Sequence, residues 1–99
     1  MKQTKRDALK VIAVDMDGVL CSDEHWTIED CKSAKPNTIN ICKVNMLFQK
    51  NFIIVYTARR DHLIPATLEW LRRNNVMYHA ISNIKMPADV YYDDKAEVL

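Results

Sequence analysis

The chain has 99 residues, of which 48% are hydrophobic and 27% charged, and its formal net charge is +1. These values are typical of one globular domain and exclude a disordered chain, and the dispersed basic residues do not form the stripe expected of a nucleic-acid-binding surface. No apolar run approaches the roughly 20 residues that span a bilayer, so no membrane partner is expected. The three cysteines, Cys21, Cys31 and Cys42, lack a C-x-x-C spacing, which favours reduced thiols in a cytoplasmic protein over disulfides or zinc.

The first half of the chain is predicted to contain one strand and one helix within a single domain, residues 1–99. Residues 1–9 are polar and basic and are predicted to be a flexible lead-in. In residues 10–14, apolar side chains occupy both sets of alternating positions, which is typical of a strand buried on both faces of a sheet. The stretch 19–35 has no clear period, and apolar residues then recur at helical spacing between Pro36 and Asn51.

The second half is predicted to contain three strands and one helix. Residues 52–56 (FIIVY) read as a second buried strand, and 78–82 and 89–92 as two shorter ones. Between residues 56 and 78, Asp61 can cap a helix with an apolar stripe at Ile64, Leu68 and Leu71 and with Trp70 on its flank. This alternation predicts an α/β, Rossmann-like, mostly parallel sheet of about four strands with helices on both faces.

Chemically useful side chains follow each predicted strand. They are Asp15 and Asp17 after the first, Thr57 and Ala58 after the second, Lys85 near the third, and Asp93 and Asp94 after the last. Ligands of parallel sheets bind beyond the carboxyl ends of the strands, so these residues are expected to share one pocket. Two carboxylates about 4 Å apart repel by roughly 4 kcal/mol, which favours a bound hard cation such as Mg²⁺. A phosphoryl group would complete such a site.

Each feature alone has an ordinary explanation. Asp15-x-Asp17 alone could be a solvated turn, Thr57 a capping hydroxyl, and Lys85 a surface charge. The acidic pair at Asp93 and Asp94 could be a polar turn. Their occurrence together, in this order and at strand ends, favours a catalytic site.

The four segments resemble the haloacid dehalogenase (HAD) superfamily of phosphotransferases. The matching motifs, in chain order, are VIAVDMDGVL, IIVYTAR, NIKMPAD and VYYDD. Within that superfamily, PATLEWLRRNNVMYHAI and ADVYYDDKAEVL resemble small bacterial and phage members of the capsule-biosynthesis type. The resemblance covers about residues 10–97.

The resemblance implies a role for each motif residue. Asp15 would be the nucleophile that forms an aspartyl-phosphate, and Asp17 the general acid and then base. Thr57 and the Ala58 amide would bind phosphoryl oxygens, while Lys85 would offset charge. Mg²⁺ would be held by the Asp15 carboxylate, the Asp17 backbone carbonyl and the final acidic pair, with Asp94 ligating directly and Asp93 through water, or the reverse.

Two departures from the family pattern affect the assignment. Val19 stands where many members have threonine, and Met86 separates Lys85 from Pro87, so Lys95 is a rival for the lysine role. The spacing between motifs leaves no room for a cap domain. A short flap from about Leu20 to Ala34 would cover the site at most, with Trp26 as a candidate substrate contact.

The leading expectation is therefore a Mg²⁺-dependent phosphomonoester hydrolase acting on a phosphorylated metabolite, either a sugar phosphate or a nucleotide. A nucleic-acid end phosphatase is the alternative, less favoured by the near-zero charge, and a catalytically silent HAD-like binding domain is a second. The residue order argues against a signalling receiver. The sequence leaves the oligomeric state open. The chain's single glycine, Gly18, follows Asp17 directly, where a sharp turn is expected.

Overall fold

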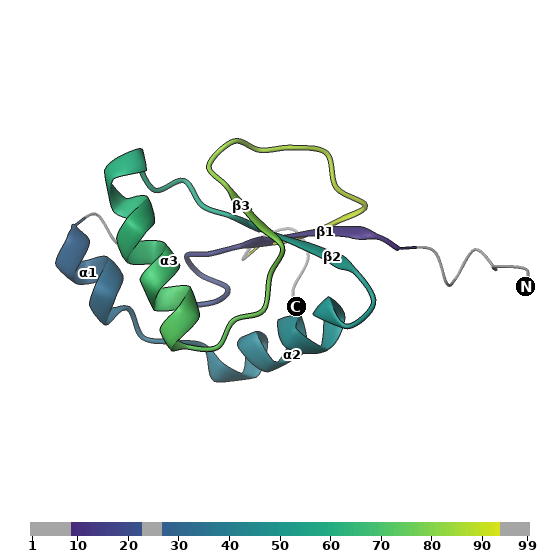
Figure 1. Ribbon diagram of the computed structural model, residues 1–99, viewed down its shortest axis with the longest axis horizontal. Helices are drawn as coiled ribbons and strands as arrows, with labels where there is room; N and C mark the ends of the chain where they lie inside the picture. Colours follow the sequence, from purple (N-terminus) through teal and green to yellow (C-terminus); the bar gives the residue numbers. More distant parts are fainter. Residues whose placement is uncertain (1–8, 23–26, 94–99) are drawn as a thin grey trace, which may run out of the picture.

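Four parallel strands and three α-helices alternate along the chain in a computed structural model that describes residues 9–22 and 27–93. Figure 1 shows their arrangement, and a short 3₁₀ helix, η2 (Asp61–Leu63), leads into the third helix. The elements are β1 (Val11–Asp15), α1 (Ile28–Ser33), α2 (Thr38–Phe48), β2 (Phe52–Tyr56), α3 (Ile64–Arg73), β3 (Ala80–Ser82) and β4 (Val90–Tyr92).

The strand order is β3-β2-β1-β4, and every neighbouring pair is parallel. The predicted α/β sheet of four parallel strands is therefore confirmed. The two central strands, β1 and β2, are the two that read from the sequence as buried on both faces. Their middle residues are all buried.

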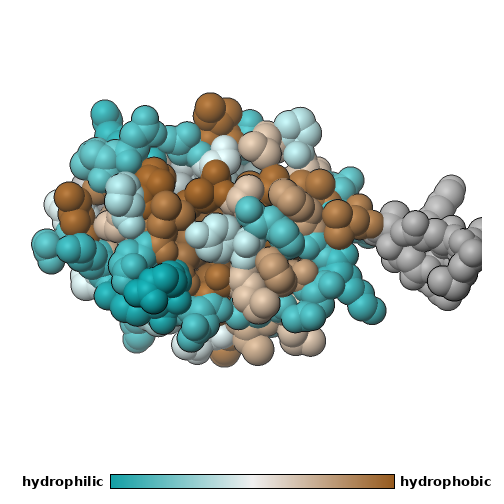
Figure 2. Space-filling model, viewed as in Figure 1, coloured by the Kyte–Doolittle hydropathy of each residue, from teal (hydrophilic) through white to brown (hydrophobic). Residues whose placement is uncertain are grey.

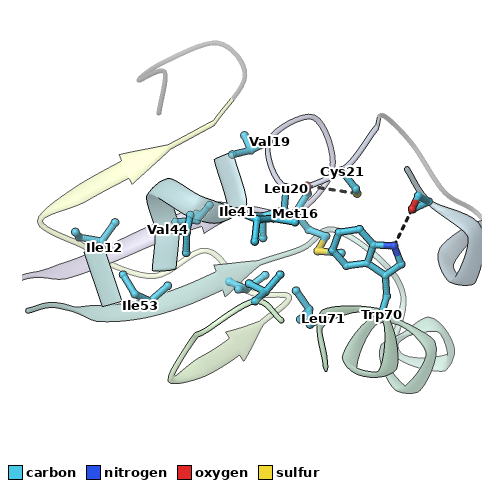
Figure 3. Packing of buried hydrophobic residues seen from close by; sticks show 14 residues of the cluster. Ile12, Met16, Val19, Leu20, Cys21, Ile41, Val44, Ile53, Trp70 and Leu71 are labelled. Carbon is cyan, nitrogen blue, oxygen red and sulfur yellow. Dashed lines mark hydrogen bonds between the residues drawn. The ribbon is translucent and has the colours of Figure 1, made fainter. Parts of the chain in front are cut away.

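One face of the sheet packs against α2 and α3. Alternate strand residues Ile12, Val14, Ile53 and Val55 belong to the same buried cluster as Val44 of α2 and Trp70 of α3 (Figure 3). Helix α1 packs against α3, so the described helices share one side.

The opposite face differs from the expectation of helices on both faces. Among the described residues, it is crossed by the segment 83–89, which returns the chain from β3 to β4 (Figure 1). This link is too short to hold a helix of ordinary length while crossing two strands. The side chains on this face include Ala13 and Ile54, which are buried, and Tyr56 and Tyr91, which are half-buried.

Helix α1 was not expected, since residues 19–35 show no apolar period. It is six residues long and begins because the Thr27 hydroxyl accepts a hydrogen bond from the Asp30 backbone N–H. Its one buried residue is Cys31, and one apolar position is too few to give a periodic signal.

Helix α3 buries part of the predicted stripe. Leu71 is fully buried as expected, and so is Trp70 from the flank of that stripe, whereas Leu68 is exposed. The Trp70 indole N–H donates a hydrogen bond of 2.8 Å to the Ala34 carbonyl, and this contact fixes the side of the helix that turns inward. Asp61 does not cap the helix with its side chain.

Several predicted features lie outside the described residues: most of the lead-in at 1–9, Trp26 of the flap, and both Asp94 and Lys95. None of the described helices has the length and apolar character needed to cross a lipid bilayer. On the face of the molecule seen in Figure 2, apolar side chains are interspersed with hydrophilic ones.

Candidate active site

The carboxyl ends of the four strands meet at one edge of the sheet. Asp15, Tyr56 and Ser82 are level with one another across β1, β2 and β3. Tyr92 pairs with Val14, so Asp93 follows at the level of Asp15. The topology therefore brings Asp15 and Asp93, which are far apart in the sequence, to the same edge of the sheet.

Asp15, the expected nucleophile, ends β1 and is contacted from the neighbouring strand. The Tyr91 hydroxyl donates a hydrogen bond of 2.9 Å to Asp15 Oδ1. Burial raises the pKa of Tyr91 well above its ordinary value, and the carboxylate of Asp15 raises it further, so the phenol remains a donor. This contact fixes one oxygen of Asp15.

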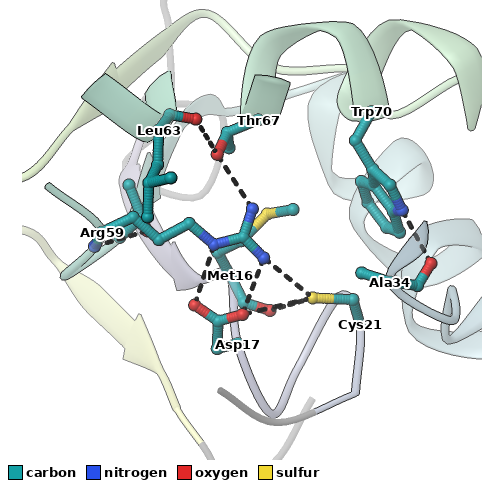
Figure 4. A network of polar contacts seen from close by, with 9 residues as sticks. Met16, Asp17, Cys21, Ala34, Arg59, Leu63, Thr67 and Trp70 are labelled. Atoms are coloured by element: carbon teal, nitrogen blue, oxygen red, sulfur yellow. Dashed lines mark hydrogen bonds and ion pairs between the residues drawn. The ribbon is translucent and has the colours of Figure 1, made fainter. Parts of the chain in front are cut away.

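Asp17, the expected acid and base, faces the inside of the molecule and pairs with Arg59 (Figure 4). Arg59 Nη2 donates to Asp17 Oδ1 at 2.8 Å, and Arg59 Nε donates to Oδ2 at 3.2 Å. The Cys21 thiol also lies 3.6 Å from Oδ1. A carboxylate has about four acceptor positions, so these contacts leave one on Oδ2 for a further partner.

The Arg59 side chain is almost completely buried and needs partners for its charge. Its Nη1 donates a hydrogen bond of 2.9 Å to the Thr67 hydroxyl on α3, which in turn donates to the Leu63 carbonyl. Burial lowers the pKa of Arg59, but the hydrogen bonds and the charge of Asp17 outweigh it and raise the pKa above the ordinary value. Helix α3 thus anchors the partner of Asp17.

Thr57 follows β2 directly and is buried. Its hydroxyl oxygen accepts a hydrogen bond of 3.1 Å from the Arg59 backbone N–H, which closes a local turn at the end of the strand. That contact leaves the hydroxyl hydrogen available to donate to a ligand. Ala58, between them, is exposed.

Lys85 lies in the segment 83–89, on the face opposite the helices. Its ammonium nitrogen is 4.7 Å from the centre of the Tyr91 ring and 6.0 Å from that of Tyr56. These cation–π contacts hold an otherwise exposed lysine over the same tyrosine that binds Asp15. The structure therefore places Lys85 on the nucleophile's side of the sheet.

The loop after β1 turns sharply at Gly18, whose φ is 88°. Its N–H donates to the Cys21 carbonyl at 3.0 Å, and the Leu20 N–H donates to the Met16 carbonyl at the same distance. The left-handed conformation strongly favours glycine, in agreement with the position of the chain's single glycine. Asn40 of α2 supports the loop through a hydrogen bond to the Val19 carbonyl.

Within residues 9–22 and 27–93, no three carboxylate, histidine or cysteine side chains form a metal-binding group. Asp94, expected to ligate Mg²⁺, lies outside that part of the chain. Asp15 and Asp93 supply hard oxygen ligands at the same level of neighbouring strands. These donor types fit the expected cation, while the Asp17 side chain is paired with Arg59. The metal site itself stays a prediction.

Sequence reasoning assigned no role to Arg59 or Tyr91. Arg59 follows Thr57-Ala58 after a buried strand, and a buried arginine calls for a carboxylate partner. A buried arginine at this position could therefore have predicted a nearby carboxylate partner, although not that the partner is Asp17. Tyr91 sits on the same parity of β4 as Ala13 of β1, and only the register of the two strands shows that it reaches Asp15.

No protein-family model and no curated protein matches the sequence. Solved structures do match the fold. A conserved protein of Bacteroides thetaiotaomicron superposes with a TM-score of 0.71 at 21% identity, over 90% of this chain and 78% of that one. The TM-score shows a shared α/β fold, and at this low identity the match shows the fold alone.

Two further matches come from structures of a Pnkp1/Rnl/Hen1 complex, one of which is described as an RNA repair complex. The TM-scores are 0.65 and 0.64, at 16% and 14% identity, and each alignment covers 96% of this chain. The chain spans 29% and 34% of the length of these two relatives. It is thus similar in fold to one part of a larger protein.

Proposed function

We propose that the protein is a Mg²⁺-dependent phosphomonoester hydrolase that acts through an aspartyl-phosphate. The observation that carries this proposal is that Asp15 and Thr57 lie at the carboxyl ends of neighbouring strands, with Lys85 over the Tyr91 ring whose hydroxyl contacts Asp15. A nucleophile, a hydroxyl donor and a cation are the groups that phosphoryl transfer requires. The resemblance of the four motifs to the HAD superfamily supports the same reaction.

In the first step, an Asp15 carboxylate oxygen would attack phosphorus, and the bond from phosphorus to the leaving oxygen would break. The hydrogen bond from the Tyr91 hydroxyl to Oδ1 would orient the Asp15 carboxylate for this attack. A proton from Asp17 Oδ2, the oxygen with a remaining acceptor position, would go to the leaving oxygen. Thr57, the Ala58 amide and Lys85 would stabilise the phosphoryl oxygens.

In the second step, Asp17 would take a proton from water, and the resulting hydroxide would attack the aspartyl-phosphate. The bond from phosphorus to Asp15 breaks, which releases inorganic phosphate and restores both carboxyl groups. Arg59 directs Asp17 in both steps. Asp15, the Asp17 carbonyl and the Asp93–Asp94 pair would hold Mg²⁺, which would supply charge stabilisation.

A second candidate is a phosphatase that acts on nucleic-acid ends. It is favoured by the fold similarity to a chain of the RNA repair complex. The net charge of +1 argues against a large nucleic-acid footprint. A short end bound at the strand edge needs few basic residues, so the two candidates differ only in the leaving group.

The test is phosphate release from a panel of phosphorylated metabolites and from a 3′-phosphorylated oligonucleotide, with Mg²⁺ and with EDTA. Wild type is expected to release phosphate only with the metal, and Asp15→Asn to release none. Asp30→Asn, an exposed carboxylate on α1, is the matched control and should retain activity. Equal phosphate release by wild type and Asp15→Asn would refute the nucleophile assignment.

A further inference from the structure

A polar cavity adjoins the proposed phosphoryl-binding residues on the side of β3. Its volume is about 520 Å³, and it is lined by Ala58, Arg59, Arg60, Asp61, His62 and Asn83. Ala58 belongs both to this cavity and to the proposed phosphoryl site. A group bound in the cavity would therefore be part of the same ligand or would touch it.

The two consecutive arginines in this region point to different places. Arg59 turns inward, where Asp17 and Thr67 take up its hydrogen bonds. Arg60 is exposed, and its side chain makes no hydrogen bond or ion pair to any described residue. His62 is also exposed, and its side chain makes no hydrogen bond or ion pair to a described residue. The cavity thus offers a guanidinium and an imidazole that the fold itself does not use.

The cavity also contains one carboxylate. Asp61 Oδ1 accepts a hydrogen bond of 2.6 Å from the Asn83 side-chain amide, which ties the start of η2 to the end of β3. This contact orients Asp61 toward Asn83 and fixes the wall of the cavity. Arg60 remains the group best suited to a ligand, because a guanidinium can bind two oxygens of a phosphate at once.

We propose that this cavity binds a second phosphate of the substrate, one carried by the leaving group. The proposal rests on the proposed function, because it names the substrate class of that site. Arg60 follows Thr57 by three residues, a span of at most about 10 Å, and its long side chain extends the reach. Two phosphates of one small molecule, or two neighbouring phosphates at a nucleic-acid end, fit such a separation.

The experiment measures kcat/KM for matched substrate pairs. One pair is glucose 1,6-bisphosphate and glucose 1-phosphate. The other is a 3′-phosphorylated dinucleotide and its analogue with a neutral methylphosphonate linkage. Wild type is expected to prefer the member with the second phosphate by about tenfold or more in at least one pair. A preference of this size is what a hydrogen bond to a charged group typically contributes to binding. The pair that shows the preference identifies the source of the phosphate.

Arg60→Ala is expected to reduce this preference about tenfold, whereas Arg72→Ala is expected to leave it unchanged. Arg72 is the matched control because it is an exposed arginine on α3 whose pairing is with Glu69. A preference that survives Arg60→Ala, or no preference in either pair, overturns the proposal. Thermal unfolding of both variants checks that each is folded.

A binding measurement separates this proposal from the proposed function. Adenosine 3′,5′-bisphosphate is titrated into the Asp15→Asn protein and into the double variant Asp15→Asn, Arg60→Ala. The dissociation constants are compared, and this measurement requires no turnover. If wild type releases no phosphate but Arg60 strengthens binding about tenfold, the hydrolase assignment fails, and the cavity remains a phosphate-binding site without a leaving group. If turnover occurs and Arg60→Ala changes neither binding nor preference, the cavity assignment fails and the hydrolase stands.

Discussion

Arg59 and Asp17 lie 42 positions apart in the sequence and form an ion pair with two hydrogen bonds, in which Arg59 Nη2 lies 2.8 Å from Asp17 Oδ1. Only 2% of the Arg59 side chain is exposed, against 23% for Asp17. The pair joins the loop after β1 to the end of β2, and Thr67 extends it to α3. It therefore serves both the fold and the direction in which Asp17 points.

Loss of this pair is predicted to affect stability and rate separately. Arg59→Ala leaves a partly buried carboxylate without its partner and should lower the free energy of unfolding by about 3 kcal/mol. Arg59→Lys keeps the positive charge but loses the planar guanidinium that donates to both Asp17 oxygens. This variant should therefore fold yet lose up to about 100-fold in kcat. Urea unfolding and steady-state kinetics measure the two effects, with Arg72→Lys as the control. Wild-type kcat in Arg59→Lys would exclude a positioning role.

Lys85 is predicted to matter for rate far more than for stability. Lys85→Ala removes one positive charge from the proposed phosphoryl site and should lower kcat about 100-fold. The cation–π contacts that it also removes contribute about 1 kcal/mol or less at an exposed position. Lys50→Ala, an exposed lysine on the turn after α2, serves as the control. Full activity in Lys85→Ala would transfer the role to Lys95.

Gly18 and Asn75 allow a matched test of backbone conformation, because both have positive φ, at 88° and 56°. Alanine at either position should lower the free energy of unfolding by about 1–2 kcal/mol. Only Gly18→Ala is expected to lower activity, because Gly18 follows Asp17, whereas Asn75 lies in the turn after α3. A larger side chain, as in Gly18→Val, should be more harmful still. Equal activity of Gly18→Ala and Asn75→Ala, measured at equal folded fractions, would contradict this role.

Cys21 gives the stability a defined dependence on pH. Burial, with the nearby negative charge of Asp17, raises the pKa of the Cys21 thiol from 9.0 to about 12. Above about pH 9 the unfolded chain loses this proton while the folded protein keeps it, so the free energy of unfolding should fall as the pH rises from 9 to 12. The decrease should be smaller in Cys21→Ala, as measured by urea unfolding across this range.

A parallel experiment uses the exposed thiol. Cys42 is exposed, whereas Cys21 and Cys31 are buried. Alkylation of the native protein near neutral pH should therefore label Cys42 first, with Cys21 reacting only on unfolding. Mass spectrometry of the digested protein identifies the labelled residue. Early labelling of Cys21 would contradict the raised pKa and the burial.

Much of the fold could be predicted because the two central strands carry an unambiguous apolar signal. Residues 52–56 coincide with β2, and 10–14 differ from β1 by one position. Helix α1 and the inward face of α3 could not be predicted. The first depends on one capping hydroxyl and one buried residue, and the second on a hydrogen bond between Trp70 and the distant Ala34 carbonyl.

The strand-end residues of the site could be predicted for the same reason, since parallel strands present their carboxyl ends at one edge. The roles assigned to them stay predictions. The supporting contacts of Arg59 and Tyr91 depend on how strands pair and how α3 docks, which local patterns do not specify. Tertiary partners of this kind become visible only when the register is known.

The segment 83–89 has a consequence for heat sensitivity. It is the layer that crosses the second face of the sheet, and it also carries Lys85 over Tyr56 and Tyr91. Local unfolding of this segment alone would uncover the two rings and withdraw the lysine in a single event while the helical side stays folded, and amide-hydrogen exchange would detect it. Inactivation on warming is therefore expected to precede the loss of helical circular dichroism.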